Sequence, residues 1–267
     1  MSLASGSARH KFQFGRVHLT IETEPVDIDR NLERHRRLAE VTRELVELLD
    51  SHRLAAAWAV GDPAHSATTA LLTLSEIQHE VALLGDHHWL GPNAGRKRFA
   101  HELARRVSQA RAAGIAVSTL VPRVAPIAEH VDLIVKHGLH AVVGSNGVME
   151  GRFRTTVPRA LHYGVWEFAT TSRLPLHGTW WSGASRKLIR QIRRAAEERA
   201  TIHLLVDAPA LEQEGVQAMR SIRRLIREIG QLHERGLLRA ETLGAAAARL
   251  SDLPVATPQR SILRLAA

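Results

Sequence analysis

Residues 20–25 read Thr-Ile-Glu-Thr-Glu-Pro and close an apolar run that starts at Val17. The run predicts a buried strand over residues 17–22. Because side chains alternate along a strand, Glu22 and Glu24 are expected on one side of its end. Two such carboxylates repel each other unless a metal, a cation or a proton lies between them. The same letters also fit a pair of surface glutamates in a polar loop.

Strand-like and helix-like patterns alternate outward from this stretch. Amphipathic patterns predict helices after most strands, including one over residues 156–162. Six further strands are expected, over residues 55–60, 80–84, 115–121, 140–143, 165–171 and 202–207. Repeated β-then-α order implies a parallel sheet, and no glycine fingerprint for a dinucleotide is present. We therefore expect a single distorted (β/α) barrel of about seven strands over residues 17–250, with tails at 1–16 and 251–267.

Polar residues follow three of the other predicted strands, where the active sites of such barrels lie. Asp86-His87-His88-Trp89 follows the third strand and fits a metal or acid–base site as well as a solvated turn. Arg123 follows Val121-Pro122 at the end of the fourth strand. Asp207 ends the last strand, where it is either a site carboxylate or the cap of the next helix.

In order and spacing, these segments resemble the polysaccharide deacetylase family, which has the NodB-homology fold and is carbohydrate esterase family 4. The family's first motif reads Thr-Phe-Asp-Asp-Gly-Pro, in which the first Asp is the general base and the second binds the metal. The resemblance places Glu22 at the base and Thr23 at the metal ligand. In relatives with an Asp-x-Glu version, the corresponding ligand would be Glu24.

The departures from the family pattern fall on the metal ligands. The family's two metal histidines are spaced i and i+4, and here Leu84 stands at the first place and His88 at the second. The family's arginine steers the catalytic carboxylate, a role that would fall to Arg123, although its motif order differs. Asp207 stands where the family has its general-acid histidine. The resemblance covers roughly residues 17–250 and includes Trp58-Ala59-Val60-Gly61 and the closing Thr242-Leu243.

Three functions stay open. The first is a hydrolase of amide C–N bonds in a sugar-like substrate, with Glu22 and Asp207 catalytic, Arg123 and Trp180 binding substrate, and Glu24 and His88 holding a divalent metal, zinc or another. Weak or absent zinc binding is expected, because an open zinc site keeps three protein ligands. The second is an inactive relative that binds a carbohydrate or a partner. In it Trp180 and Trp181 would stack on a sugar, although tryptophan is more often core.

The third function is a basic binder of an anionic polymer. The net charge is +9, and only four of the 36 basic residues are lysine, which leaves 32 arginines. Codon bias in a GC-rich genome is the other explanation of this excess, and the more usual one. Arg220, Arg223, Arg224 and Arg227 share one helical face. Nucleic acid is not the expected partner, because aromatic residues are only 4% of the chain and base stacking needs them.

The composition also limits the chemistry and the location that can be expected of this protein. The chain has no cysteine, which excludes disulfides and thiolate chemistry. No stretch approaches the ~20 apolar residues of a membrane span. Residues 1–16 lack the apolar centre of a signal peptide, so a cytoplasmic location is expected.

Overall fold

The structure is a computed structural model that describes residues 14–25, 32–91, 94–123, 127–144, 157–175 and 183–252. The seven predicted strands are all present, and they join one ten-stranded sheet in the order β6-β7-β5-β4-β3-β2-β1-β9-β8, with β10 beside β1. The strands are β1 (Gly15–Glu22), β2 (Ala57–Val60), β3 (Glu80–Gly85), β4 (Val117–Pro122), β5 (Ala141–Gly144), β6 (Arg159–Ala160), β7 (Trp166–Ala169), β8 (Ser172–Leu174), β9 (Thr201–Asp207) and β10 (Leu238–Ala240). Every pairing is parallel except that of β6 with β7.

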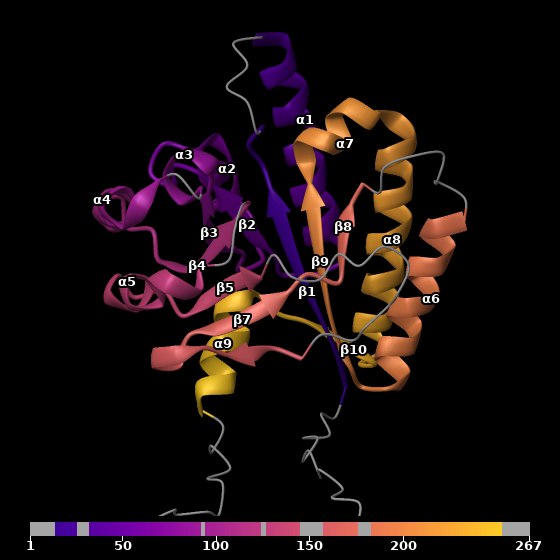
Figure 1. Ribbon diagram of the computed structural model, residues 1–267. Coiled ribbons are helices and arrows are strands. Elements are labelled where there is room, and N and C mark those ends of the chain that lie inside the picture. The colour runs from indigo at the N-terminus through magenta and orange to yellow at the C-terminus, as the bar shows by residue number, and fades with distance from the viewer. Residues whose placement is uncertain are drawn as a thin grey trace, which may run out of the picture.

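One extended segment contributes strands near both ends of this strand order. β7 and β8 are separated only by Thr170 and Thr171, yet β7 pairs with β5 and β8 pairs with β9. The sheet therefore curls on itself into a distorted barrel, as Figure 1 shows. This confirms the expected fold class and adds one detail: β7 lies within the predicted strand at 165–171, whereas β8 comes directly after that range and pairs with a different neighbour.

Helices cover the outside of the barrel, except α9, which packs against the interior cluster (Figure 1). The helices are α1 (Leu32–Ser51), α2 (Ala67–Leu72), α3 (His87–Leu90), α4 (Gly95–Ala112), α5 (Val131–Lys136), α6 (Gly183–Glu197), α7 (Ala208–Glu214), α8 (Val216–Glu234) and α9 (Leu243–Asp252). Short 3₁₀ turns lie at Ala128–His130 and His162–Gly164. One apolar cluster packs α1, α6, α7 and α8 on β1 and β9, and another packs α3, α4 and α5 on β3, β4 and β5. None of the described helices is both long and apolar enough to cross a membrane.

The alternation along β1 and β9 separates the outer core from the barrel interior. Val17, Leu19 and Ile21 belong to the outer cluster under the helices, as do the alternate residues of β9. A third cluster fills the interior with small and medium side chains from β2 to β5, and α9 contributes Ala246 and Ala247 to it. The even-numbered residues of β1 are thereby directed inward.

These inward residues form a buried polar column along β1. At the N-terminal end, Arg16 donates to the Glu241 carboxylate at 2.8 Å, and His18 Nδ1 donates to the Glu241 carbonyl at 3.1 Å. Further along, Thr20 Oγ1 lies 2.9 Å from His203 Nε2. Buried polar groups require such partners. The column ends at Glu22, at the C-terminal end of the strand.

The helix predicted over residues 156–162 is wrong. The described part of this stretch holds the short strand β6, which pairs antiparallel with β7, and the start of a 3₁₀ turn. Pairing with a neighbouring strand supplies the backbone hydrogen bonds that a helix would otherwise make.

Candidate functional site at the mouth of the barrel

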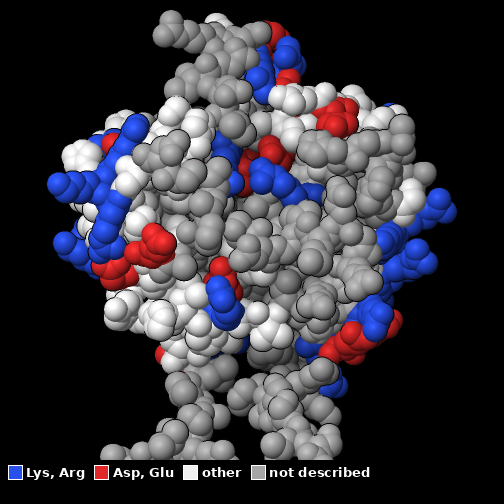
Figure 2. All heavy atoms as spheres, in the orientation of Figure 1, with Lys and Arg blue, Asp and Glu red and all other residues white. Residues whose placement is uncertain are grey.

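The structure brings Glu22 and Asp207 together at the C-terminal end of the barrel. They are register partners at the ends of β1 and β9. Arg173, on β8, donates through Nη2 to Glu22 Oε2 at 2.9 Å and to Asp207 Oδ2 at 2.8 Å. Figure 2 shows acidic and basic atoms side by side above the ends of these strands. A shared guanidinium thus lies where two carboxylates would otherwise repel each other.

Arg123 reaches the same carboxylate from the other side. Its Nε donates to Glu22 Oε2 at 3.1 Å, and Nη1 donates to the Pro25 carbonyl at 3.1 Å. Its Nη2 donates to the Glu24 carbonyl. The Arg123 side chain is 8% exposed and that of Glu22 is 1% exposed. Arg123 is therefore fixed in a buried ion pair, and its predicted role in binding substrate stays a prediction.

Sequence reasoning missed Arg173. Its side chain is 38% exposed, more than any other member of this network. Burial works against its charge, but the Glu22 and Asp207 carboxylates prevail and raise the pKa of Arg173 above its ordinary value. The available signal was a basic residue close after a predicted strand. Because the strand is predicted to end at Thr171, Arg173 falls in the loop that follows it.

Asp207 caps the next helix, one of the two roles expected for it, and its role as a site carboxylate stays a prediction. Its Oδ1 accepts a hydrogen bond from the Ala210 amide at 3.0 Å, so it caps α7. Its Oδ2 faces Arg173 in the mouth. Both carboxylate oxygens of Asp207 are therefore engaged as acceptors.

The Glu24 carboxylate has a different hydrogen-bond partner from the Glu22 and Asp207 carboxylates. Its Oε1 accepts from the Gly61 amide at 2.6 Å, close to the end of β2. Gly61 suits this approach, because a Cβ at that position would collide with the Glu24 carboxylate. Arg106 donates to the Gly61 carbonyl and continues this network away from Glu22.

His88 does not approach these carboxylates through any hydrogen bond or ion pair found in the described chain. It lies in α3, where its amide donates to Asp86 Oδ1 at 2.8 Å, and its side chain is exposed. Its ring lies 4.0 Å from that of His87, centroid to centroid. Leu84, at the place of the family's other histidine, is buried in the barrel interior. Trp180 and Trp181 lie outside the described residues.

The donors found here do not fit a divalent metal. Within the described ranges, no group of three or more His, Cys, Asp or Glu residues is placed to hold a metal ion. Glu22 and Asp207 are bound by guanidinium groups, and Glu24 is bound by a backbone amide. Glu24 and His88 share no hydrogen bond or ion pair in the described ranges, so their expected pairing as metal ligands stays a prediction, and no step below uses a metal.

Zinc binding is expected to be weak and insensitive to His88. Protein purified without added ions and dialysed against zinc should retain well under one zinc per chain by elemental analysis, since only His88 remains of the expected ligands. A His88→Ala variant should retain the same amount. Stoichiometric zinc that is lost in His88→Ala would show that His88 does ligate.

The arginine-rich face of α8 is exposed, and ion pairs occur on it and on the neighbouring helix α6. Arg223 pairs with Glu44 of α1 at 2.5 Å. Across α6 and α8, Arg193 pairs with Glu228 at 2.7 Å. Figure 2 shows blue atoms together with red ones along this side of the molecule. Part of the arginine excess is thus used in surface ion pairs.

Comparison with known proteins gives a structural likeness only. The sequence matches no protein-family model, and it matches no curated protein. The fold is similar to that of a proposed polysaccharide deacetylase from Mycobacterium smegmatis, with a TM-score of 0.63, 15% identity, and coverage of 88% of this chain and 89% of the other.

Two further structures are similar. The polysaccharide deacetylase Bc1974 from Bacillus cereus has a TM-score of 0.50 and 11% identity, with coverage of 85% of this chain and 91% of that one. A 4-alpha-glucanotransferase from Thermococcus litoralis has a TM-score of 0.54 and 12% identity over 89% of this chain, which corresponds to 40% of the larger protein. The chain therefore has the distorted (β/α)-barrel fold of polysaccharide deacetylases, with a Glu–Arg–Asp network at the mouth of its barrel.

Proposed function

We propose that this protein binds a neutral, sugar-like ligand at the mouth of the barrel. The observation that carries the proposal is Glu22 Oε1, which is buried and has no hydrogen-bond partner in the described part of the chain. A buried acceptor without a donor is costly. A hydroxyl or amide N–H of a ligand would supply that donor, and Arg173, the more exposed member of the network, would be the first group that the ligand meets.

The charge balance of the mouth favours a neutral ligand. Arg123 and Arg173 offset Glu22 and Asp207, so the four groups sum to no net charge. An anionic ligand would meet the two carboxylates, and a cationic one would meet the two guanidinium groups. Hydroxyl groups both donate and accept, which suits a site that presents both kinds of partner. Two of the similar folds are named for action on polysaccharides and a third for action on glucan, which supports a carbohydrate.

Hydrolysis of an amide is the second candidate, favoured by the closeness of Glu22 and Asp207. Glu22 would take a proton from water, the resulting hydroxide would attack the amide carbonyl, and Asp207 would protonate the leaving nitrogen as the C–N bond breaks. This scheme requires a proton on Asp207. Both of its oxygens already accept hydrogen bonds, so the scheme ranks below binding.

Glu22→Gln is expected to weaken binding of acetylated hexosamine oligosaccharides by about tenfold or more, because the amide replaces one acceptor oxygen with a donor. Isothermal titration calorimetry would measure this, with Arg173→Gln as a second variant on the more exposed side of the network. Arg159→Gln is the control, because Arg159 pairs with Glu167 at 2.6 Å on the outside of the barrel.

A parallel assay for released acetate separates the two candidates. Binding without acetate release supports the binding function. Acetate release that is lost in Glu22→Gln would instead establish the hydrolase. If the wild-type protein binds no member of a panel of neutral oligosaccharides, the proposed function is wrong.

A further inference from the structure

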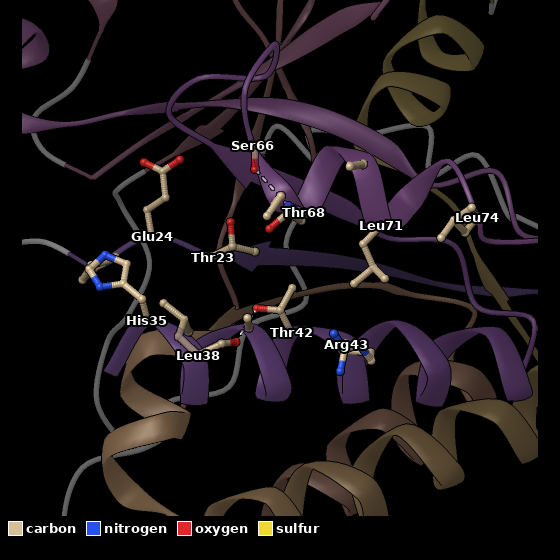
Figure 3. A pocket seen from close by; sticks show the side chains of 14 residues that line it. Thr23, Glu24, His35, Leu38, Thr42, Arg43, Ser66, Thr68, Leu71 and Leu74 are labelled. Carbon is tan, nitrogen blue, oxygen red and sulfur yellow. Dashed lines mark hydrogen bonds between the residues drawn. The ribbon is translucent and has the colours of Figure 1, made fainter. Parts of the chain in front are cut away.

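A pocket lies between α1 and α2, beside the mouth of the barrel. Its volume is about 620 Å³, which falls in the range of roughly 300–1,000 Å³ that holds small molecules. Figure 3 shows α1 on one side and α2 on the other, with Thr23 and Glu24 from the end of β1 at one end of the pocket. Neither Arg123 nor Arg173 lines it, so the pocket is distinct from the Glu–Arg–Asp network.

The lining combines apolar side chains with hydroxyl groups. Leu38 of α1 and Leu71 of α2 provide the apolar contacts, together with alanines from both helices. The polar part of the lining consists of the hydroxyl groups of Thr23, Thr42, Ser66 and Thr68, together with the side chains of Glu24, His35 and Arg43. A pyranose ring has the same mixture, since its C–H faces are apolar and its edge carries hydroxyls.

The hydroxyl groups keep capacity for a ligand. Thr42 donates to the Leu38 carbonyl at 2.8 Å, and Thr23 donates to the Ala59 carbonyl at 3.3 Å. Each oxygen thus retains lone pairs as an acceptor. Ser66 accepts from the Thr68 amide at 3.2 Å, which leaves its own proton to be donated. The pocket therefore offers both acceptors and a donor to an uncharged, hydroxyl-bearing molecule.

The pocket and the mouth share one wall, the segment 23–25 after β1. Thr23, Glu24 and Pro25 line the pocket. On the mouth side, Arg123 donates to the carbonyls of Glu24 and Pro25 while it also holds Glu22. This segment follows the C-terminal end of β1, and α2 follows β2, so both sites lie at the same end of the sheet.

We infer that the pocket between α1 and α2 is a second subsite for a neutral sugar unit, so that the ligand is an oligosaccharide that crosses the 23–25 segment. This inference rests on the proposed function of the mouth. A single sugar would occupy the mouth alone, and longer chains would gain contacts with Leu38, Leu71 and the hydroxyl groups.

The test measures how binding affinity depends on the length of the oligosaccharide, in the wild type and in a variant whose pocket is filled by a large side chain. Affinities of acetylated hexosamine oligosaccharides of one to six units would be measured by calorimetry for the wild type and for Ala39→Phe, which places a large ring on an exposed pocket residue of α1. Ala112→Phe is the matched control, because Ala112 is an exposed alanine of α4 and does not line the pocket. Thr42→Val removes one hydroxyl at nearly constant shape.

We expect wild-type affinity to rise at least tenfold with chain length. Ala39→Phe should remove that rise and leave the single sugar unaffected, Thr42→Val should reduce it, and Ala112→Phe should preserve it. An unchanged length dependence in Ala39→Phe overturns the subsite while the mouth function stands. A loss in Ala39→Phe with no effect of Glu22→Gln keeps the pocket as a site and refutes the mouth. Absence of binding by the wild type refutes both.

Discussion

Replacing Glu22 with alanine is expected to lower the free energy of unfolding by about 3–5 kcal/mol, because it leaves a buried guanidinium without its charged partner. Arg123 is 8% exposed, and its carboxylate partner is Glu22. Arg173 loses one of its two carboxylates at the same time. Equilibrium unfolding in urea, followed by circular dichroism, would measure the loss.

An exposed ion pair provides the control for this experiment. Arg159 is 65% exposed and pairs with Glu167. Arg159→Ala should cost only about 0–1 kcal/mol, which is typical of surface salt bridges. If Glu22→Ala also costs less than about 1 kcal/mol, the network at the mouth is not the buried ion pair described above.

The strands of the barrel could be predicted because their signals are local. Each buried strand is a short apolar run that ends in polar residues, and the alternation along β1 even separates outward Leu19 from inward Thr20. The convergence of Glu22 and Asp207 follows from the same argument, since parallel strands end at one edge of a sheet. The structure pairs these two residues directly.

The Glu–Arg–Asp network at the mouth depends on contacts between segments that are distant in the sequence. Periodic patterns in the sequence predict helices and strands, but they do not predict such contacts. Arg173 pairs with Glu22 across 151 positions of the chain, and its place depends on how the 166–174 segment divides between β5 and β9. Glu24 was expected beside Glu22 from strand alternation. The chain leaves the strand after Glu22, so Glu24 instead faces the Gly61 amide.

The departures from the family motifs have a physical counterpart in the structure. Leu84 is part of the apolar interior cluster, where a leucine packs well and a metal-bound histidine would need open space. Guanidinium groups supply the positive charge beside Glu22. The mouth therefore holds a charge-balanced centre, in which guanidinium groups lie against the carboxylates. Such a centre can orient a polar ligand by hydrogen bonds.

The second prediction with a large effect is a loss of folding stability as the pH falls. His203 is buried inside the barrel, and burial, reinforced by the nearby His18, lowers its pKa to about 3. Its pKa in the unfolded chain is about 6.5. Between these values the unfolded chain binds a proton that the folded protein excludes. The stabilisation is therefore fully present above pH 6.5 and is lost as the pH falls toward 3, at up to about 1.4 kcal/mol per pH unit and roughly 4–5 kcal/mol in all.

Other groups determine the pH window in which this effect can be isolated. Burial also lowers the pKa values of His18 and His79, which add to the loss in the same direction. Burial tends to raise the pKa of the Glu241 carboxyl, but Arg249 and Arg16 outweigh it and lower that pKa, so the contribution of Glu241 is lost only below about pH 4.5, the ordinary range of a carboxyl group. The interval from pH 6.5 to 4.5 therefore reports mainly on the buried histidines.

Urea unfolding at several pH values in this interval would measure the slope. His203→Gln keeps a hydrogen-bonding group near Thr20 but cannot titrate, so the slope should fall by up to about 1.4 kcal/mol per pH unit. His101→Gln, on the exposed side of α4, should leave the slope unchanged. An equal slope in the wild type and His203→Gln would mean that the barrel admits a proton at His203. The polar column from Arg16 to Glu22 would then be open to water along its length, rather than sealed between the two ends of the barrel.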